Sequence, residues 1–146
     1  MIDVQVEICR EGVQLPVYAR EGDAGMDVRA AVDITVAPGA TVIVPTGLKV
    51  AIPAGYEIQV RPRSGMSYKT PLRVPNAPGT IDSGYRDELG VLIWNSSPDT
   101  AYEIKAGDRI AQLVLQKVPI MHFIPVENIS AIGTSRGGGF GSTGKE

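Results

Sequence analysis

Two arginines, Arg61 and Arg63, stand beside a serine and a glycine in residues 61–67, after an alternating stretch that begins at Tyr56. The alternation predicts a strand, and Pro71 limits any following helix to a short piece that begins near Ser64. The start of a helix offers unpaired N–H groups, and a guanidinium offers a planar set of donors that suits phosphate oxygens. The segment therefore fits an anion site, and it fits equally well a capped turn with two solvated arginines.

A second segment, residues 77–88, holds an acid and a tyrosine around a predicted turn. We expect Ser83 and Gly84 to form a two-residue hairpin tip, because glycine accepts a positive φ. Asp82 and Tyr85 would then flank that tip. Taken alone, the segment is better explained as a solvent-facing turn, in which aspartate is common.

Two further segments place a polar side chain close to a glycine. Residues 24–29 contain Asp27, without the repeated acid spacing of an EF-hand calcium loop. Residues 107–112 are typical of a turn that leads into a strand, where an aspartate is more often stabilising than catalytic. Strand alternation predicts two faces there, one with Asp108, Ile110 and Gln112 and the other with Arg109 and Ala111.

The glycine-rich last stretch contains a partial phosphate-loop pattern from Gly139 to Lys145. Glu146 follows where the P-loop needs a serine or threonine to bind magnesium, so the P-loop is rejected. An arm of this composition could still close over a phosphate-bearing ligand, with Arg136 on the charge and Phe140 stacked on a base. Taken alone, such a tail is expected to be mobile.

The elements that must position these residues are strands. Period-two alternation and apolar runs predict strands over residues 3–8, 41–44, 48–52, 56–61, 89–94, 110–118 and 122–126. Turn signals separate them at residues 37–39, 53–55, 77–79, 97–99 and 106–108. This spacing is typical of an all-β sandwich or barrel, and no segment shows a sustained helical period.

Composition excludes several classes of function. The 146 residues suit a single domain, and a net charge of -2 argues against a general nucleic-acid binder. One cysteine, Cys9, and one histidine, His122, exclude an internal disulfide and a closed Cys/His zinc site.

No run approaches the ~20 apolar residues that cross a bilayer. Residues 1–7 alternate acidic and apolar side chains, without the basic start and apolar block of a signal peptide. We therefore expect no membrane partner and a cytoplasmic or equivalent reducing compartment.

Taken in order, five segments form one pattern: AGMDVRA at 24–30, RPRSGMS at 61–67, NAPGTIDSGYRDELG at 76–90, GDRIAQL at 107–113 and RGGGFGSTG at 136–144. Each segment alone is weak, but the set is highly specific and covers nearly the whole chain. On these segments the chain resembles the trimeric dUTP nucleotidohydrolase (dUTPase) family. Asp87 departs from the pattern, since many members have glycine there.

The resemblance implies a fold, an assembly and an activity. The fold would be a distorted β-jelly roll over residues 1–130, with a C-terminal arm over residues 131–146 that closes an active site. The chain would form homotrimers with active sites shared between subunits. It would hydrolyse dUTP to dUMP and pyrophosphate, which limits uracil in DNA and supplies dUMP for thymidylate synthesis.

The resemblance also implies roles for single residues. Asp82 would be the general base that activates the attacking water, and Asp27 would help to hold Mg2+ through water. The phosphates would be bound by Arg63, Ser64, Gly65, Gln112 and Arg136. The uracil and the deoxyribose would be contacted by Asn76, Gly79, Thr80, Ile81, Tyr85, Gly90 and Phe140.

Two other hypotheses for the function stay open. One is a dCTP deaminase-like or bifunctional enzyme of the same fold, and the other is a non-catalytic dUTP-binding sensor. The segments fit the hydrolase pattern better than the deaminase pattern. Asp82 counts against a sensor, because a protein that only binds needs no acid beside the α-phosphate.

Overall fold

The computed structural model describes residues 1–135 and residue 137. That part of the chain consists of short strands, one α-helix of six residues, α1 (Ser64–Lys69), and a 3-10 turn, η1 (Ile129–Ala131). The strands are β1 (Gln5–Ile8), β2 (Met26–Arg29), β3 (Ile34–Val36), β4 (Thr41–Pro45), β5 (Leu48–Ala51), β6 (Tyr56–Arg61), β7 (Leu72–Arg73), β8 (Gly79–Ile81), β9 (Gly90–Asn95), β10 (Tyr102–Ile104) and β11 (Arg109–Lys117).

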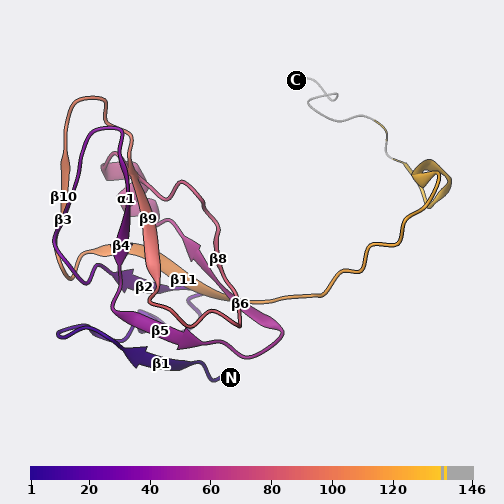
Figure 1. Cartoon of the computed structure of the whole chain (residues 1–146), viewed down its shortest axis with the longest axis horizontal. Helices are drawn as coiled ribbons and strands as arrows, with labels where there is room; N and C mark the ends of the chain where they lie inside the picture. Colours follow the sequence, from indigo (N-terminus) through magenta and orange to yellow (C-terminus); the bar gives the residue numbers. More distant parts are fainter. Residues whose placement is uncertain (136, 138–146) are drawn as a thin grey trace.

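The strands pair in antiparallel sheets whose neighbours are distant in the sequence (Figure 1). The largest sheet has the order β2-β11-β6-β8, and a second has the order β4-β9-β7. Two strand pairs, β1-β5 and β10-β3, complete the body. Antiparallel pairing between distant strands is the connectivity of a jelly roll. The predicted all-β fold with one short helix is confirmed.

The core is a single cluster of aliphatic side chains to which all four sheets contribute. Val44 and Ile93 of the β4-β9-β7 sheet are fully buried, as is Val36 of β3. In β5, buried and partly buried residues alternate, which is the period-two pattern expected of a strand with one face on the core. Each fully buried side chain of this size stabilises the fold by roughly 1.5–3 kcal/mol.

Most of the predicted elements are found within two residues of their expected bounds, including β6 and the short helix that begins at Ser64. The strand predicted over residues 122–126 is wrong, because no strand lies between Val118 and Asn128. The side chains in that stretch are exposed, and no other strand of the described chain pairs with it. A strand needs a partner for its N–H and C=O groups, and alternation alone does not supply one.

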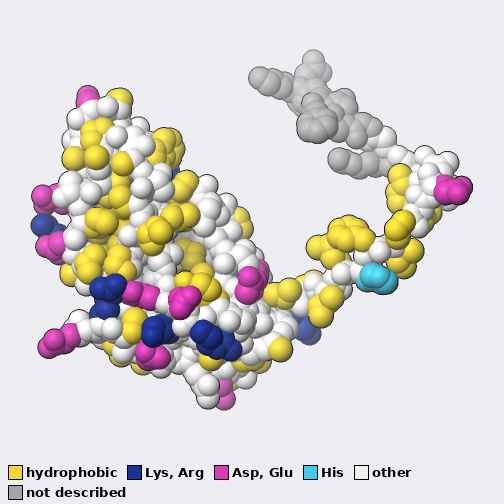
Figure 2. Space-filling model, viewed as in Figure 1, with side chains coloured by type: hydrophobic (Ala, Val, Ile, Leu, Met, Phe, Trp, Pro, Cys, Tyr) yellow, Lys and Arg dark blue, Asp and Glu magenta, His cyan; other side chains and the backbone are white. Residues whose placement is uncertain are grey.

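After β11 the chain leaves the body and extends away from it (Figure 1). Large apolar side chains are exposed along this stretch (Figure 2), among them Ile120 at 96% and Phe123 at 82%. A contiguous row of exposed apolar side chains is typical of an interaction surface. None of the helices in the described residues is long and apolar enough to cross a membrane.

Candidate active site

Strand β11 brings three of the predicted site segments together. Its register pairs Gln112 with Asp27 of β2 on one side and with Arg61 of β6 on the other. Arg63 follows the end of β6 by two residues. The segments around residues 27, 63 and 112 are distant in the sequence. Because of this pairing, they meet at one end of the four-stranded sheet.

The Asp27 carboxylate lies between two guanidinium groups. Arg63 Nε donates to Oδ1 at 2.7 Å, and Arg109 Nη1 donates to Oδ2 at 3.3 Å. The side chain of Asp27 keeps 32% of its surface exposed. Two positive charges and one negative charge leave one positive charge in excess, so the cluster favours a further anion such as a phosphate.

A β-bulge in β11 places Arg109 in this cluster. The register with β2 shifts between Arg109 and Ala111, and both Ile110 and Ala111 are buried. The predicted faces, with Ile110 beside Gln112 and Arg109 beside Ala111, are therefore wrong, because an extra residue re-aims the side chains around it. No role was predicted for Arg109, since a bulge leaves no signal in the alternation on either side of it.

Gln112 is held between β2 and the end of β6. Its Nε2 donates to Pro62 O at 3.0 Å. A Cβ at Gly25 would lie only 2.7 Å from Gln112 Oε1, which is closer than real Cβ contacts. The glycine in the first predicted segment therefore leaves room for the Gln112 amide beside Asp27.

Ser64 and Gly65 are exposed in the first turn of α1, directly after Arg63. Arg63 is the N-cap residue of α1, and its guanidinium, which has only donors and cannot cap the helix N–H groups, contacts Asp27 instead. A hollow of about 440 Å³ opens beside them, and Arg63, Gly65, Lys69 and Arg109 are among its lining residues. Its charged lining side chains are these three basic residues and one acidic residue, Asp108, so positive charge is in excess and the hollow suits a negatively charged ligand.

The predicted base, Asp82, lies in an exposed turn directly after β8. The turn closes around Ser83 and Gly84, because Tyr85 N donates to Asp82 O at 3.1 Å. The predicted turn is thus present, but the predicted hairpin is wrong. Strand β8 pairs with β6, and β9 pairs with β4 and β7. Gly84 does not adopt the positive φ that a tight hairpin tip was expected to need.

The residues expected to contact uracil and deoxyribose lie along the same stretch. Asn76 and Thr80 are exposed, and Ile81 is half-buried. A Cβ at Gly79 would lie 3.1 Å from Asn76 Nδ2, so β8 and the Asn76 side chain approach closely. A Cβ at Gly90 would meet Ile43 Cγ2 at 2.5 Å, which gives that glycine a packing role.

Strand β6 lies between the residues predicted to bind phosphate and the stretch predicted to contact uracil and deoxyribose. β11 pairs with one edge of β6, and β8 pairs with the other. A surface hollow of about 430 Å³ lies across it, lined by Gln59, Arg61, Pro62, Ala77, Pro78 and Gln112. The phosphate-binding candidates and the Asp82 turn thus flank one strand. The remaining candidates, Arg136 and Phe140, lie outside the described residues.

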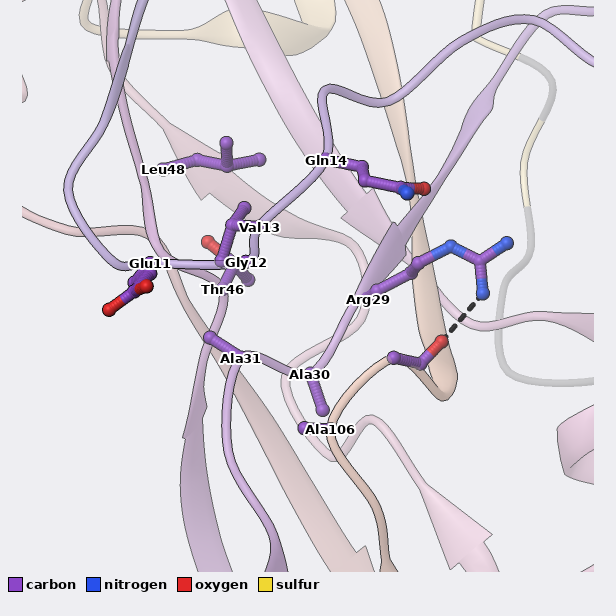
Figure 3. A pocket seen from close by; sticks show the side chains of 11 residues that line it. Glu11, Gly12, Val13, Gln14, Arg29, Ala30, Ala31, Thr46, Leu48 and Ala106 are labelled. Atoms are coloured by element: carbon purple, nitrogen blue, oxygen red, sulfur yellow. Dashed lines mark hydrogen bonds between the residues drawn. The ribbon is translucent and has the colours of Figure 1, made fainter.

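A separate cavity of about 330 Å³ lies under the loop at residues 11–14 (Figure 3). Its lining includes Val13, Arg29, Thr46 and Leu48, and none of the predicted site residues that the structure describes takes part. The Arg29 guanidinium donates to Gly107 O at 2.6 Å and closes one side.

The described residues contain no group of three histidine, cysteine, aspartate or glutamate side chains that could form a complete metal site. Asp27 is the carboxylate of the basic cluster, and it stays accessible to solvent. Mg2+ keeps most of its waters and takes further ligands from phosphates, so one carboxylate beside a phosphate site fits that ion.

Comparison with known proteins decides the family. A sequence model of the dUTPase family matches residues 11–144, which include every predicted segment. The chain belongs to the dUTPase family. Two relatives are each named deoxyuridine 5′-triphosphate nucleotidohydrolase. The one from Fusobacterium nucleatum is 52% identical and covers 99% of this chain and 100% of its own. The one from Desulfotalea psychrophila is 53% identical and covers 92% of this chain and 89% of its own.

Solved dUTPase structures share the fold. The dUTPase of Staphylococcus bacteriophage 80alpha, solved as a mutant with dUpNHpp, superposes with a TM-score of 0.89 at 28% identity, over 98% of this chain and 99% of that chain. A mutant dUTPase from phage phi11 of S. aureus, described with a structural Mg(II) ion, gives a TM-score of 0.81 at 28% identity, over 87% of this chain and 98% of that chain.

Proposed function

We propose that the chain hydrolyses dUTP to dUMP and pyrophosphate at sites assembled from three copies. The observation that carries this proposal is the dUTPase match over residues 11–144, because it includes both the basic cluster and the Asp82 turn. The names of the relatives support dUTP as the substrate.

The triphosphate would bind at the cluster around Asp27. Arg63 and Arg109 both face that carboxylate, and a phosphate oxygen can take over either guanidinium as a stronger partner. Exposed Ser64 and Gly65 would add a hydroxyl and an approachable backbone N–H. Gln112 would contact the α-phosphate region, and Arg136 would reach the γ-phosphate.

Asp82 would act as the general base. Its carboxylate would take a proton from a water molecule whose oxygen attacks the α-phosphorus. The bond from that phosphorus to the bridging oxygen breaks, and pyrophosphate leaves in line with the attack. The exposed position of Asp82 in its turn supports this role, because water and substrate can both reach it.

Asp27 would help to hold Mg2+ through water. When bound, the ion would neutralise part of the charge on the triphosphate. The partial exposure of the Asp27 carboxylate supports this role. If Arg63 binds a phosphate oxygen in place of Asp27, the carboxylate can accept hydrogen bonds from water molecules bound to the ion.

Base and sugar selection would come from the stretch around β8. Asn76 and the backbone of Gly79, Thr80 and Ile81 would bind the edge of uracil. Cytosine presents a donor where uracil presents an acceptor, which would leave buried groups unpaired. Tyr85 would pack under the deoxyribose and leave no room for a 2′-hydroxyl. Gly90 would add a backbone contact, and Phe140 would cover the base.

The sites would be shared within a homotrimer. The exposed apolar side chains along residues 118–132 support such an assembly, because a monomer would leave them in water. A reducing cytoplasmic compartment agrees with an enzyme that has one free cysteine, Cys9.

The proposal is tested by measuring which product the protein releases from each nucleotide. The purified protein with Mg2+ is given dUTP, dCTP, dTTP or UTP, and pyrophosphate and ammonia are measured. We expect pyrophosphate from dUTP alone. Ammonia from dCTP would establish the deaminase alternative, and dUTP binding without any product would establish the sensor.

Asp82→Asn should lower turnover by about 10²–10⁴-fold and keep nucleotide binding. The matched control is Asp87→Asn, which makes the same change of charge at an exposed residue of the same stretch. An Asp82→Asn variant that hydrolyses dUTP at the wild-type rate would remove Asp82 from the mechanism.

A further inference from the structure

An ion pair outside the proposed contacts ties the N-terminal segment to the turn that holds Asp82 and Tyr85. Arg10 Nε donates to Glu88 Oε1 at 2.6 Å, and Arg10 Nη2 donates to Glu88 Oε2 at 2.8 Å. Gly47 N also donates to Glu88 Oε1, at 2.8 Å. A single carboxylate therefore joins three segments of the chain.

The backbone at Glu88 holds the tyrosine. Tyr85 Oη donates to the main-chain oxygen of Glu88 at 3.0 Å. The next residue is fixed on both sides, since Leu89 N donates to Leu48 O at 2.8 Å and Thr46 Oγ1 donates to Leu89 O at 2.8 Å. The orientation of the Tyr85 hydroxyl thus depends on the position of the Glu88 peptide group.

The other end of the ion pair is equally constrained. Cys9 N donates to Gly47 O at 2.8 Å, which places Arg10 over Gly47. A Cβ at Gly47 would lie 2.5 Å from Val13 Cγ2, so the N-terminal segment packs directly on this glycine. Figure 3 shows Val13 close to Thr46 and Leu48, the neighbours of Gly47. The Arg10 guanidinium is therefore presented by a packed segment.

The ion pair is better suited to fixing geometry than to adding stability. The side chains of Arg10 and Glu88 keep 41% and 24% of their surface exposed. Exposed ion pairs contribute little to the free energy of unfolding. A two-point contact between a guanidinium and a carboxylate does, however, fix the relative orientation of both groups.

We propose that Arg10 and Glu88 are positioning residues for Tyr85, and that through it they set the preference for deoxyribose over ribose. The inference rests on the proposed function, in which the Tyr85 ring lies under the sugar. Arg10 acts through the Glu88 carboxylate and the Glu88 carbonyl on the Tyr85 hydroxyl. Neither Arg10 nor Glu88 touches the substrate.

The test compares dUTP with UTP in Arg10→Met and in wild type. We expect kcat/KM for dUTP to fall about tenfold, mainly through KM, because the ring no longer has one fixed position. kcat/KM for UTP should stay the same or rise, so the dUTP-to-UTP ratio should fall by at least that factor. Arg10→Lys, which offers one contact point instead of two, should recover only part of the ratio.

Lys105→Met is the matched control. Lys105 makes two exposed ion pairs, with Asp33 and Glu103, and its loss also removes one basic charge. It should leave the ratio at the wild-type value. Glu88→Gln is the second variant, because it keeps an acceptor for Gly47 N and loses the charge, and it should lower the ratio as Arg10→Met does.

A cycle with Tyr85→Phe separates positioning from folding. If Arg10 acts through the tyrosine hydroxyl, Arg10→Met should lower the ratio no further in the Tyr85→Phe background. Equal losses for dUTP and UTP, or additive losses in the double variant, would overturn the inference. A wild type that releases no pyrophosphate from dUTP would overturn the proposed function. A wild type that hydrolyses dUTP while Arg10→Met keeps its ratio would overturn the positioning role alone.

Discussion

At the scale of single residues, Asp27 has two partners that share one carboxylate. Arg63 and Arg109 each use one of its oxygens, and the side chain is still about one-third exposed. When a phosphate binds one of the arginines, the Asp27 carboxylate can instead accept hydrogen bonds from the water molecules around a cation. In the proposed function, the cluster would therefore link the binding of the metal to the binding of the triphosphate.

Asp27→Asn should raise the Mg2+ concentration for half-maximal activity by about 10–100-fold, the usual cost of losing a partner in the outer shell of a metal. The amide keeps the shape of the side chain but removes the charge that attracts the ion. The measurement is dUTP turnover across a Mg2+ titration. The control is Asp23→Asn, at an exposed turn residue whose Oδ2 accepts a hydrogen bond from Arg20 N. An unchanged Mg2+ requirement would remove Asp27 from the metal site.

Glu88 should make the free energy of unfolding depend on pH. Hydrogen bonds from Arg10 hold the pKa of Glu88 below its ordinary value of 4.5, against the opposing effect of burial. A lowered folded-state pKa means that the stabilisation is complete above about pH 4.5 and is lost as the pH falls through the folded value. Denaturant unfolding of wild type and Glu88→Gln should therefore differ by a constant amount at neutral pH and converge in acid. A difference that widens in acid would contradict this assignment.

Sequence reasoning predicted roles for Asp27, Arg63 and Gln112, and the structure brings those three together. It singled them out because each lies in a segment of the ordered set that resembles the dUTPase family. Arg109 and the Arg10–Glu88 pair were missed for physical reasons. The first enters the cluster through a bulge, and the second joins residues 78 positions apart, which no local pattern encodes.

At the scale of elements, β11 organises the site. It pairs with both β2 and β6, and its bulge turns Arg109 toward Asp27 while Gln112 keeps its place in the register. Strand period and the short helix could be predicted because they depend on neighbours in the sequence. The predictions of a hairpin at residues 82–85 and of a strand at residues 122–126 were wrong, since the pairing of a strand depends on which other strand is available to it.

Gly25→Ala tests how tightly β2 and β11 fit around the site. The new Cβ would lie 2.7 Å from Gln112 Oε1 and 3.1 Å from Val114 Cγ2. The amide is the end of a flexible side chain and can move, so we expect only about 1 kcal/mol loss in the free energy of unfolding. Displacing Gln112 should lower kcat/KM for dUTP by about tenfold.

Kinetics and denaturant unfolding of the same preparation measure both effects. In a Gln112→Ala background, Gly25→Ala should cost little further activity, because the displaced group is already absent. A large loss of activity in that background would show that Gly25 acts through something other than Gln112.

At the scale of the whole molecule, the described body is complete as a core but leaves its last stretch without cover. The sheets bury their aliphatic side chains in one cluster, whereas Ile120, Met121 and Phe123 are exposed beyond β11. Such a row of exposed apolar side chains is typical of an interaction surface, and we propose that another copy of the chain covers it. In the proposed function, the residues from Arg136 onward would close the site.

Two truncations separate these roles. Removing residues 136–146 should leave the assembly and Tm nearly unchanged and lower dUTP turnover by about a hundredfold, because Arg136 and Phe140 contact only the substrate in the proposal. Removing residues 118–146 should also abolish the assembly, since the apolar side chains between copies are lost with them. Light scattering after size exclusion gives the mass of each variant, and pyrophosphate release gives its turnover. A chain cut at residue 135 that dissociates would place the assembly contacts in the arm, and a chain cut at residue 117 that stays trimeric would place them on the body.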